Sequence, residues 1–136
     1  MSLFVDTSAW YAAADRNDRS HERAKSILSS NEPLVTTDHI LIESWMLIRH
    51  RIGRKEAIVF SSRLPHVAHI ETVVAADLQN ALGIIEEWPD QDFSIIDCTS
   101  FAVMQRLGLR RVASFDSDFS IFRFGPDRRR AFDLLR

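Results

Sequence analysis

Short apolar runs alternate along this chain with longer segments whose apolar residues recur at helical spacing. Strands are predicted over Leu3–Val5, Leu34–Thr36, Val67–Glu71, Arg111–Ser114 and Ala131–Leu135. Helices are predicted over Ser20–Leu28, from Thr37 or Asp38 to about Arg51, and over Arg54–Arg63, Val74–Trp88 and Asp97–Leu107. This alternation is typical of an α/β fold with a mainly parallel central sheet.

The length and composition of the chain favour one globular domain, which we expect to span residues 1–136. The hydrophobic content of 46% is enough to build a core. No apolar run approaches the ~20 residues of a membrane-spanning helix, and the N-terminus lacks the basic region of a signal peptide. The single cysteine, Cys98, excludes an internal disulfide, and so we expect a cytoplasmic protein that does not bind membranes.

Four carboxylates occupy the positions that a metal site in such a fold requires. Asp6 and Asp116 follow predicted strands, Asp97 starts a helical pattern, and Glu43 lies among apolar residues of a predicted helix. In parallel α/β sheets, ligands collect beyond the carboxyl ends of the strands. A carboxylate among apolar residues is unfavourable unless it is paired or binds a cation, and hard divalent ions such as Mg²⁺ and Mn²⁺ prefer carboxylate oxygens. Without a metal, the clustered carboxylates would repel one another, and at least one should have a raised pKa.

The charge of the chain is unevenly distributed. The net charge of −2 is not that of a strongly basic nucleic-acid-binding protein. Arginine nevertheless outnumbers lysine by 15 to 2, and its planar fork suits contacts to phosphate. The basic residues form two clusters, one made of Arg49, Arg51, Arg54 and Lys55 and the other of Arg123, Arg128, Arg129, Arg130 and Arg136.

Four motifs, in this order and at this spacing, resemble those of the PIN-domain ribonucleases, most closely the VapC-like toxin branch. The first is Phe4-Val5-Asp6-Thr7-Ser8-Ala9-Trp10, and the second is Glu43 within its helix. The third and fourth are the most specific, Asp92-Phe93-Ser94-Ile95-Ile96-Asp97-Cys98-Thr99-Ser100-Phe101 and Ala113-Ser114-Phe115-Asp116-Ser117-Asp118-Phe119. The resemblance covers nearly the whole chain. It implies a PIN-like three-layer sandwich, in which a central, mainly parallel sheet is flanked by helices.

The resemblance also implies the chemistry of the site and its residues. The chain would be an endoribonuclease that uses Mg²⁺, with Mn²⁺ able to substitute, to hydrolyse phosphodiester bonds of RNA. Asp6, Glu43, Asp97 and Asp116 map to the catalytic and metal-binding acids, and Asp118 extends the metal set. Thr7, Arg49 and Arg51 are candidate substrate-binding residues, whereas Asp92 is expected to order the loop before the third acid.

Several other functions are compatible with these residues. A phosphatase of the haloacid-dehalogenase type is disfavoured, because that family requires a second aspartate at the position of Ser8. A PIN-domain nuclease of RNA processing, without an antitoxin, remains an alternative. A third alternative is a nucleic-acid-binding module whose carboxylates hold only a structural cation, and this module would bind RNA without cleaving it.

The VapC-like resemblance further implies protein partners. In that family the C-terminal segment of a small antitoxin lies in a groove of the toxin, and basic antitoxin side chains engage the acids. We expect this groove near Trp10–Ala14, Ser20–Leu28 and Ile40–Arg51, where apolar residues and arginines occur together. Acidic residues of the antitoxin would pair with arginines on the rim. We also expect the chain to form a homodimer through a separate face.

Overall fold

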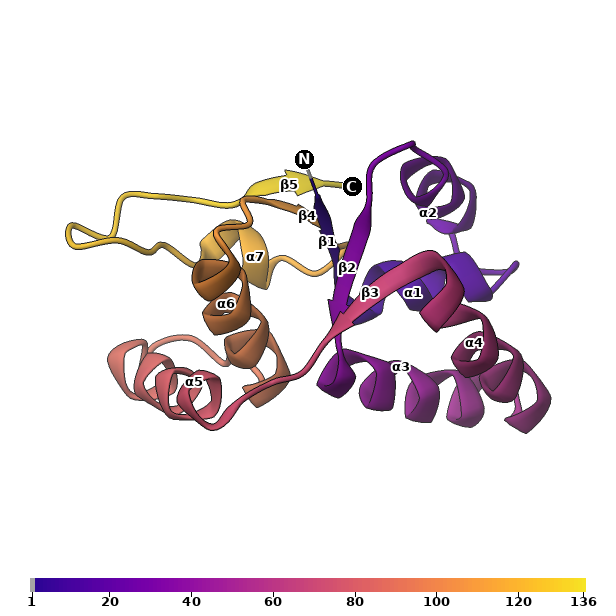
Figure 1. The fold of residues 1–136 in the computed structure, drawn as a ribbon, viewed down its shortest axis with the longest axis horizontal. Helices are drawn as coiled ribbons and strands as arrows, with labels where there is room; N and C mark the ends of the chain where they lie inside the picture. The colour runs from indigo at the N-terminus through magenta and orange to yellow at the C-terminus, as the bar shows by residue number, and fades with distance from the viewer. Residues whose placement is uncertain (1) are drawn as a thin grey trace.

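A computed structural model describes residues 2–136 and places a five-stranded sheet between two groups of helices (Figure 1). The strands are β1 (Leu3–Val5), β2 (Leu34–Thr37), β3 (Ala68–Glu71), β4 (Arg111–Ala113) and β5 (Asp133–Leu135), arranged in the order β3-β2-β1-β4-β5. All four pairings between these strands are parallel. The expected three-layer sandwich with a parallel central sheet is therefore confirmed.

The helices cover both faces of the sheet. On one side lie α1 (Thr7–Ala14), α2 (His21–Leu28), α3 (Asp38–Arg51) and α4 (Arg54–Val67), and on the other lie α5 (Ala75–Glu87), α6 (Ile95–Leu107) and α7 (Asp118–Ile121) (Figure 1). The strands are short and wholly buried at the centre, since all of Leu3, Phe4 and Val5 have no exposed surface. Strands covered on both faces have to be apolar throughout, which explains the continuous apolar run of β1.

A second part of the core is a cluster of phenylalanine rings beneath α6. Phe101 stacks on Phe122 with a centroid separation of 4.2 Å, and it meets Phe119 edge-on at 5.0 Å. Phe132, just before β5, joins the same cluster and lies 4.8 Å from Phe124. These contacts fix α6 and α7 against the sheet, and both helices carry acidic residues of the candidate site.

Two predicted helix boundaries were wrong, and local chemistry explains both. A helix was predicted to end at Arg63 and a strand to begin at Val67, but α4 continues through Pro65 to Val67. The proline lies in the last turn, where its missing N–H removes a single hydrogen bond. The helix predicted to begin at Asp97 begins at Ile95, because the side chain of Ser94 caps it by accepting a hydrogen bond from the amide of Asp97.

Candidate functional site

The order of the strands creates a crevice between β1 and β4. From β1 the chain proceeds outward to β2 and β3 on one side, whereas β4 and β5 lie on the other, so the direction of winding reverses between β1 and β4. Ligands of open parallel sheets bind at such a reversal, beyond the carboxyl ends of the strands. Asp6 directly follows β1, and Asp116 lies three residues after the end of β4. The backbone amide of Asp6 donates to the carbonyl of Ala113, which joins the two strand ends.

Three of the predicted acids come together at this point. Asp6, Asp97 and Asp116 each present an oxygen such that all three oxygens lie within 4.8 Å of one another. Asp6 precedes α1, Asp97 lies in the first turn of α6, and Asp116 lies in the turn between β4 and α7. Three elements far apart in the chain therefore supply one compact cluster of carboxylates.

The carboxylate of Asp6 is held by two serines. Its Oδ2 accepts hydrogen bonds from Ser114 Oγ at 2.9 Å and from Ser8 Oγ at 3.1 Å, while its Oδ1 is buried without a partner. The Asp6 side chain is only 2% exposed, and this burial raises its pKa to about 6 despite the two serines. A buried carboxylate oxygen without a donor is free to coordinate a cation.

Asp97 is more strongly perturbed. Burial, a hydrogen bond with Asp118 and repulsion from Asp6 and Asp116 together raise its pKa to about 9. In the absence of a cation, this carboxyl group is therefore protonated at neutral pH. The expected mutual repulsion of the acids is confirmed in direction at both Asp6 and Asp97. A divalent cation would compensate for this repulsion, and the donor set of carboxylate oxygens fits Mg²⁺ or Mn²⁺.

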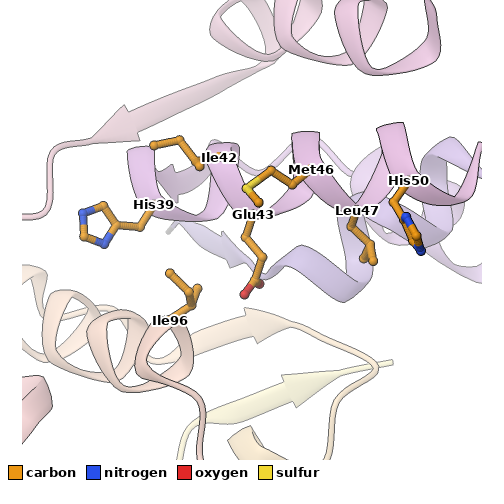
Figure 2. A pocket seen from close by; sticks show the side chains of 7 residues that line it. All are labelled: His39, Ile42, Glu43, Met46, Leu47, His50 and Ile96. Atoms are coloured by element: carbon orange, nitrogen blue, oxygen red, sulfur yellow. The ribbon is translucent and has the colours of Figure 1, made fainter. Parts of the chain in front are cut away.

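Glu43 and Asp118 line the same cleft without belonging to the compact cluster. The cleft has a volume of about 390 Å³, and it is lined by Asp6, Thr7, Ser8, Glu43, Leu47, Asp92, Ser94, Asp97, Asp116 and Asp118. Glu43 extends from α3 toward α6, on the side of Ile96 (Figure 2). Asp118 begins α7, and its amide donates to Asp116 Oδ1 at 3.0 Å. All five predicted metal-binding acids thus face one cleft.

Of the three predicted substrate-binding residues, only Thr7 lines the cleft. Thr7 lies in the cleft, and its buried Oγ1 has no hydrogen-bond partner. Arg49 and Arg51 are exposed in the last turn of α3 and do not line the cleft. Arg51 lies over the ring of Tyr11 at 5.1 Å and shares a neighbouring cavity with Ser8. The structure therefore places Arg51 beside the cleft, on the side of Ser8.

Sequence reasoning missed three serines that organise the acids. Ser114 Oγ donates to Asp6 and accepts from the amide of Asp116, so one hydroxyl links two acids. Ser8 Oγ donates to Asp6 and accepts from the amide of Phe115. Ser94 caps α6 and thereby orients Asp97. Only Ser94 had a signal in the sequence, because a serine three residues before an acid is a common start of a helix.

The fold and the site together define a class: α/β proteins that gather carboxylates at the reversal of a parallel sheet, in an arrangement that fits a divalent cation. The PIN domain family model matches residues 3–125. The chain belongs to the PIN-domain family, as its motifs predicted.

Individual relatives lie within the VapC branch. The chain is 37% identical over 120 residues to the 23S rRNA-specific endonuclease VapC20 of Mycobacterium tuberculosis, covering 87% of this chain and 92% of the relative. It also resembles the crystal structure of M. tuberculosis VapC20, described as a Sarcin-Ricin loop cleaving toxin, with a TM-score of 0.83, 35% identity and coverage of 88% and 93%. VapBC2 from Rickettsia felis, bound to a DNA fragment from its promoter, shares the fold with a TM-score of 0.68 at 10% identity, covering 89% and 92%.

Proposed function

We propose that this chain is a divalent-metal-dependent endoribonuclease that acts as the toxin of a toxin–antitoxin pair. The observation that carries the proposal is the cluster of Asp6, Asp97 and Asp116, whose oxygens lie within 4.8 Å of one another. The family model spans residues 3–125, and β5 completes the same sheet beyond it, which supports one PIN domain over residues 1–136. No helix within residues 2–136 is long and apolar enough to cross a membrane. We place the protein in the cytoplasm, where the buried thiol of Cys98 stays reduced.

Asp6, Asp97 and Asp116 would hold the cation, with Glu43 and Asp118 as further ligands from the walls of the cleft. Bound Mg²⁺ or Mn²⁺ would supply charge neutralisation at the phosphate and a water of lowered pKa. Ser8 and Ser114 orient the Asp6 carboxylate, and Ser94 orients Asp97. We expect the hydroxyl of Thr7, which has no protein partner, to donate to a phosphate oxygen of RNA.

A 23S rRNA fragment that contains the Sarcin-Ricin loop is the first substrate to test, because the VapC20 relative is described as cleaving that loop. We expect cleavage with Mg²⁺ or Mn²⁺ that stops in EDTA. Asp6→Asn should abolish cleavage, whereas Asp92→Asn, which changes an exposed acid of the cleft wall, should be much milder. Full cleavage in EDTA or by Asp6→Asn would contradict the assignment. RNA binding without any cleavage would favour the alternative of a binding module.

An antitoxin-binding groove is supported by a second cavity of about 410 Å³. Its apolar lining comes from α1, α2 and α4, and it includes Trp10, Ala13, Ala14, Leu28, Val59, Phe60, Leu64 and Val67. The expected segments in α1 and α2 contribute, but α4 takes the place that was predicted for α3. Lys55 and Arg63 stand on the rim, together with Glu56, and can pair with acidic residues of an antitoxin.

Growth assays test whether the chain has an antitoxin partner. Expression of the chain alone should slow growth, and co-expression of a small antitoxin encoded beside it should restore growth and co-purify. Val59→Glu, on an exposed position of the groove, should weaken the complex without affecting RNA cleavage. Normal growth during strong expression of the soluble, active chain would favour the alternative of an RNA-processing nuclease.

A homodimer is supported by an unpartnered face of α3. Ile42 is 55% exposed and Met46, one turn later, is 61% exposed, and they line an almost wholly apolar cavity of about 630 Å³ with His39, Glu43, Leu47, His50 and Ile96 (Figure 2). Large apolar side chains exposed on successive turns are typical of an interface. Helix α3 begins with Asp38 and ends with Arg49, His50 and Arg51, so two antiparallel copies would place opposite charges together. Met46→Glu should convert a dimer in light scattering into a monomer, and an unchanged mass would contradict this interface.

A further inference from the structure

The cleft itself cannot attract RNA by charge. Six acids line it and repel phosphate, and one or two bound divalent ions carry too few positive charges to outweigh them. The chain as a whole carries a formal net charge of −2. Affinity for a polyanion must therefore come from basic surfaces outside the cleft, since phosphate contacts supply most of the binding energy for nucleic acids. The following inference rests on the proposed ribonuclease function.

One such surface surrounds the loop between α7 and β5. Arg110, Arg128, Arg129 and Arg130, here called the C-terminal arginine patch, are all exposed. Arg110 and Arg130 line one crevice of about 610 Å³, whose other lining residues are Met104, Gln105, Gly108, Leu109, Phe124 and Gly125. This lining contains no carboxylate, in contrast to the catalytic cleft. The guanidinium groups around it offer the forked donors that suit phosphate oxygens.

The loop that carries the patch is firmly anchored. Phe124 and Arg130 exchange two backbone hydrogen bonds of 2.9 and 3.2 Å, and Phe132 packs into the phenylalanine cluster of the core. Arg128 adopts a positive φ of 53°, a conformation that non-glycine residues rarely adopt. Its side chain lies over Trp88 at 5.7 Å and pairs with Glu87 at 3.1 Å. An anchored loop loses little conformational freedom when it binds, which favours affinity.

A short segment of the chain connects the patch to the cleft, although the two share no lining residue. Trp88, on which Arg128 rests, begins the segment 88–94 that leads from α5 to α6. The later residues of that segment, Asp92 and Ser94, line the cleft. We propose that the C-terminal arginine patch is a second RNA-binding surface, which contacts backbone phosphates of a folded RNA away from the bond that is cut. A folded RNA holds such phosphates at fixed positions, whereas a short single strand that fills the cleft does not reach the patch.

The test compares two double variants that remove equal charge. Arg129→Ala/Arg130→Ala changes the patch, and Arg16→Ala/Lys25→Ala changes exposed residues on the side of α1 and α2. Binding is measured in the Asp6→Asn background with Mg²⁺, so that RNA stays intact, and the probes are an RNA hairpin and a short single-stranded oligonucleotide. Cleavage of the hairpin is measured in chains that retain Asp6.

We expect the patch variant to bind the hairpin roughly tenfold more weakly, with a salt dependence whose slope falls by about 0.7–0.9 for each phosphate that the arginines no longer neutralise. Its KM should rise with kcat retained, and its affinity for the short oligonucleotide should stay unchanged. The control variant should match the parent. Arg128→Gly, which suits the positive φ and so preserves the fold, should weaken hairpin binding in the same way.

Three results would overturn the proposal. The first is an unchanged affinity of the patch variant for the hairpin, which would indicate that the arginines bind an acidic protein partner instead of RNA. Equal losses of affinity in the patch and control variants would reveal a general effect of charge. Equal losses of affinity for the hairpin and the short oligonucleotide would place the patch at the cleaved strand. The proposed function itself fails if the chain with an unaltered patch binds neither probe and cleaves no RNA. This failure is distinguishable from failure of the patch proposal, because it is seen without any patch substitution.

Discussion

Replacing Asp97 by asparagine should stabilise the metal-free protein. The pKa of Asp97 is about 9 in the folded chain, against an ordinary value of 3.8. The folded state therefore takes up a proton that the unfolded state lacks at neutral pH, and stability falls as pH rises from about 4 toward 9. Asparagine resembles the protonated acid without titrating, and its amide can donate to Asp118 as the protonated carboxyl group does.

The size of the effect follows from the shift. At pH 7 the proton uptake by Asp97 corresponds to at most about 4 kcal/mol of lost stability. Asp6 and Asp116 share the repulsion, so part of this energy remains in the variant, and we expect a gain of about 2 kcal/mol. For a chain of this size, such a gain raises the melting temperature by about 5–10 °C.

Thermal unfolding in EDTA at several pH values measures this gain. Asp97→Asn should melt well above the parent at pH 7.5, and the difference should shrink toward pH 5, where the parent carboxyl group is protonated at little cost. Asp92→Asn removes an exposed acid of the same cleft and serves as the control, with no expected change. Saturating Mg²⁺ should stabilise the parent more than the variant. A variant that melts with the parent in EDTA, or a gain that does not depend on pH, would refute the reasoning.

Other substitutions test the supports of the fold and the site. Arg106→Ala leaves the buried Asp77 carboxylate without its partner at 2.9 Å, and urea unfolding should show a loss of about 2 kcal/mol, which an unshifted midpoint would contradict. Thr37→Ala removes the side-chain cap of α3 and should lower stability by about 1 kcal/mol, whereas Thr37→Ser should retain it; equal losses of stability would exclude the cap as the cause. Ser114→Ala removes a donor to Asp6 and should raise the pKa of that acid further, so the acid limb of the pH profile for RNA cleavage should move to higher pH. An acid limb at its original pH would show that Asp6 does not control it.

The sequence predicted the strands well because their apolar runs are short and sharply bounded. Leu3–Val5 matches β1, and the acids after β1 and β4 lie together as the rule for parallel sheets requires. The start of α6 was less predictable, because Ser94-Ile95-Ile96 has the apolar pattern of a strand. The cap by Ser94 decides that this segment is helical.

The links among the acids could not be predicted from the sequence. Ser8 and Ser114 are 106 residues apart and meet only because β4 pairs with β1, an order of strands that local patterns do not encode. The positions of Arg49 and Arg51 relative to the cleft were likewise not predictable from the sequence. Arg49 and Arg51 lie near Glu43 in the sequence, yet the helical turn directs them away from the cleft lining.

The hydrogen bond between Ser114 and Asp6 determines when, during synthesis on the ribosome, the nascent chain can complete its site. It joins residues 108 positions apart, and the strand that delivers Ser114 is the fourth of five to be synthesised. A nascent chain that ends before β4 can form helices α1–α6, but it lacks Asp116 and the donor that fixes Asp6. Domains fold as units once their long-range pairings become possible. Nuclease activity should therefore arise only when nearly the whole chain has left the ribosome. An antitoxin that is synthesised earlier would then already be present when the nuclease becomes active.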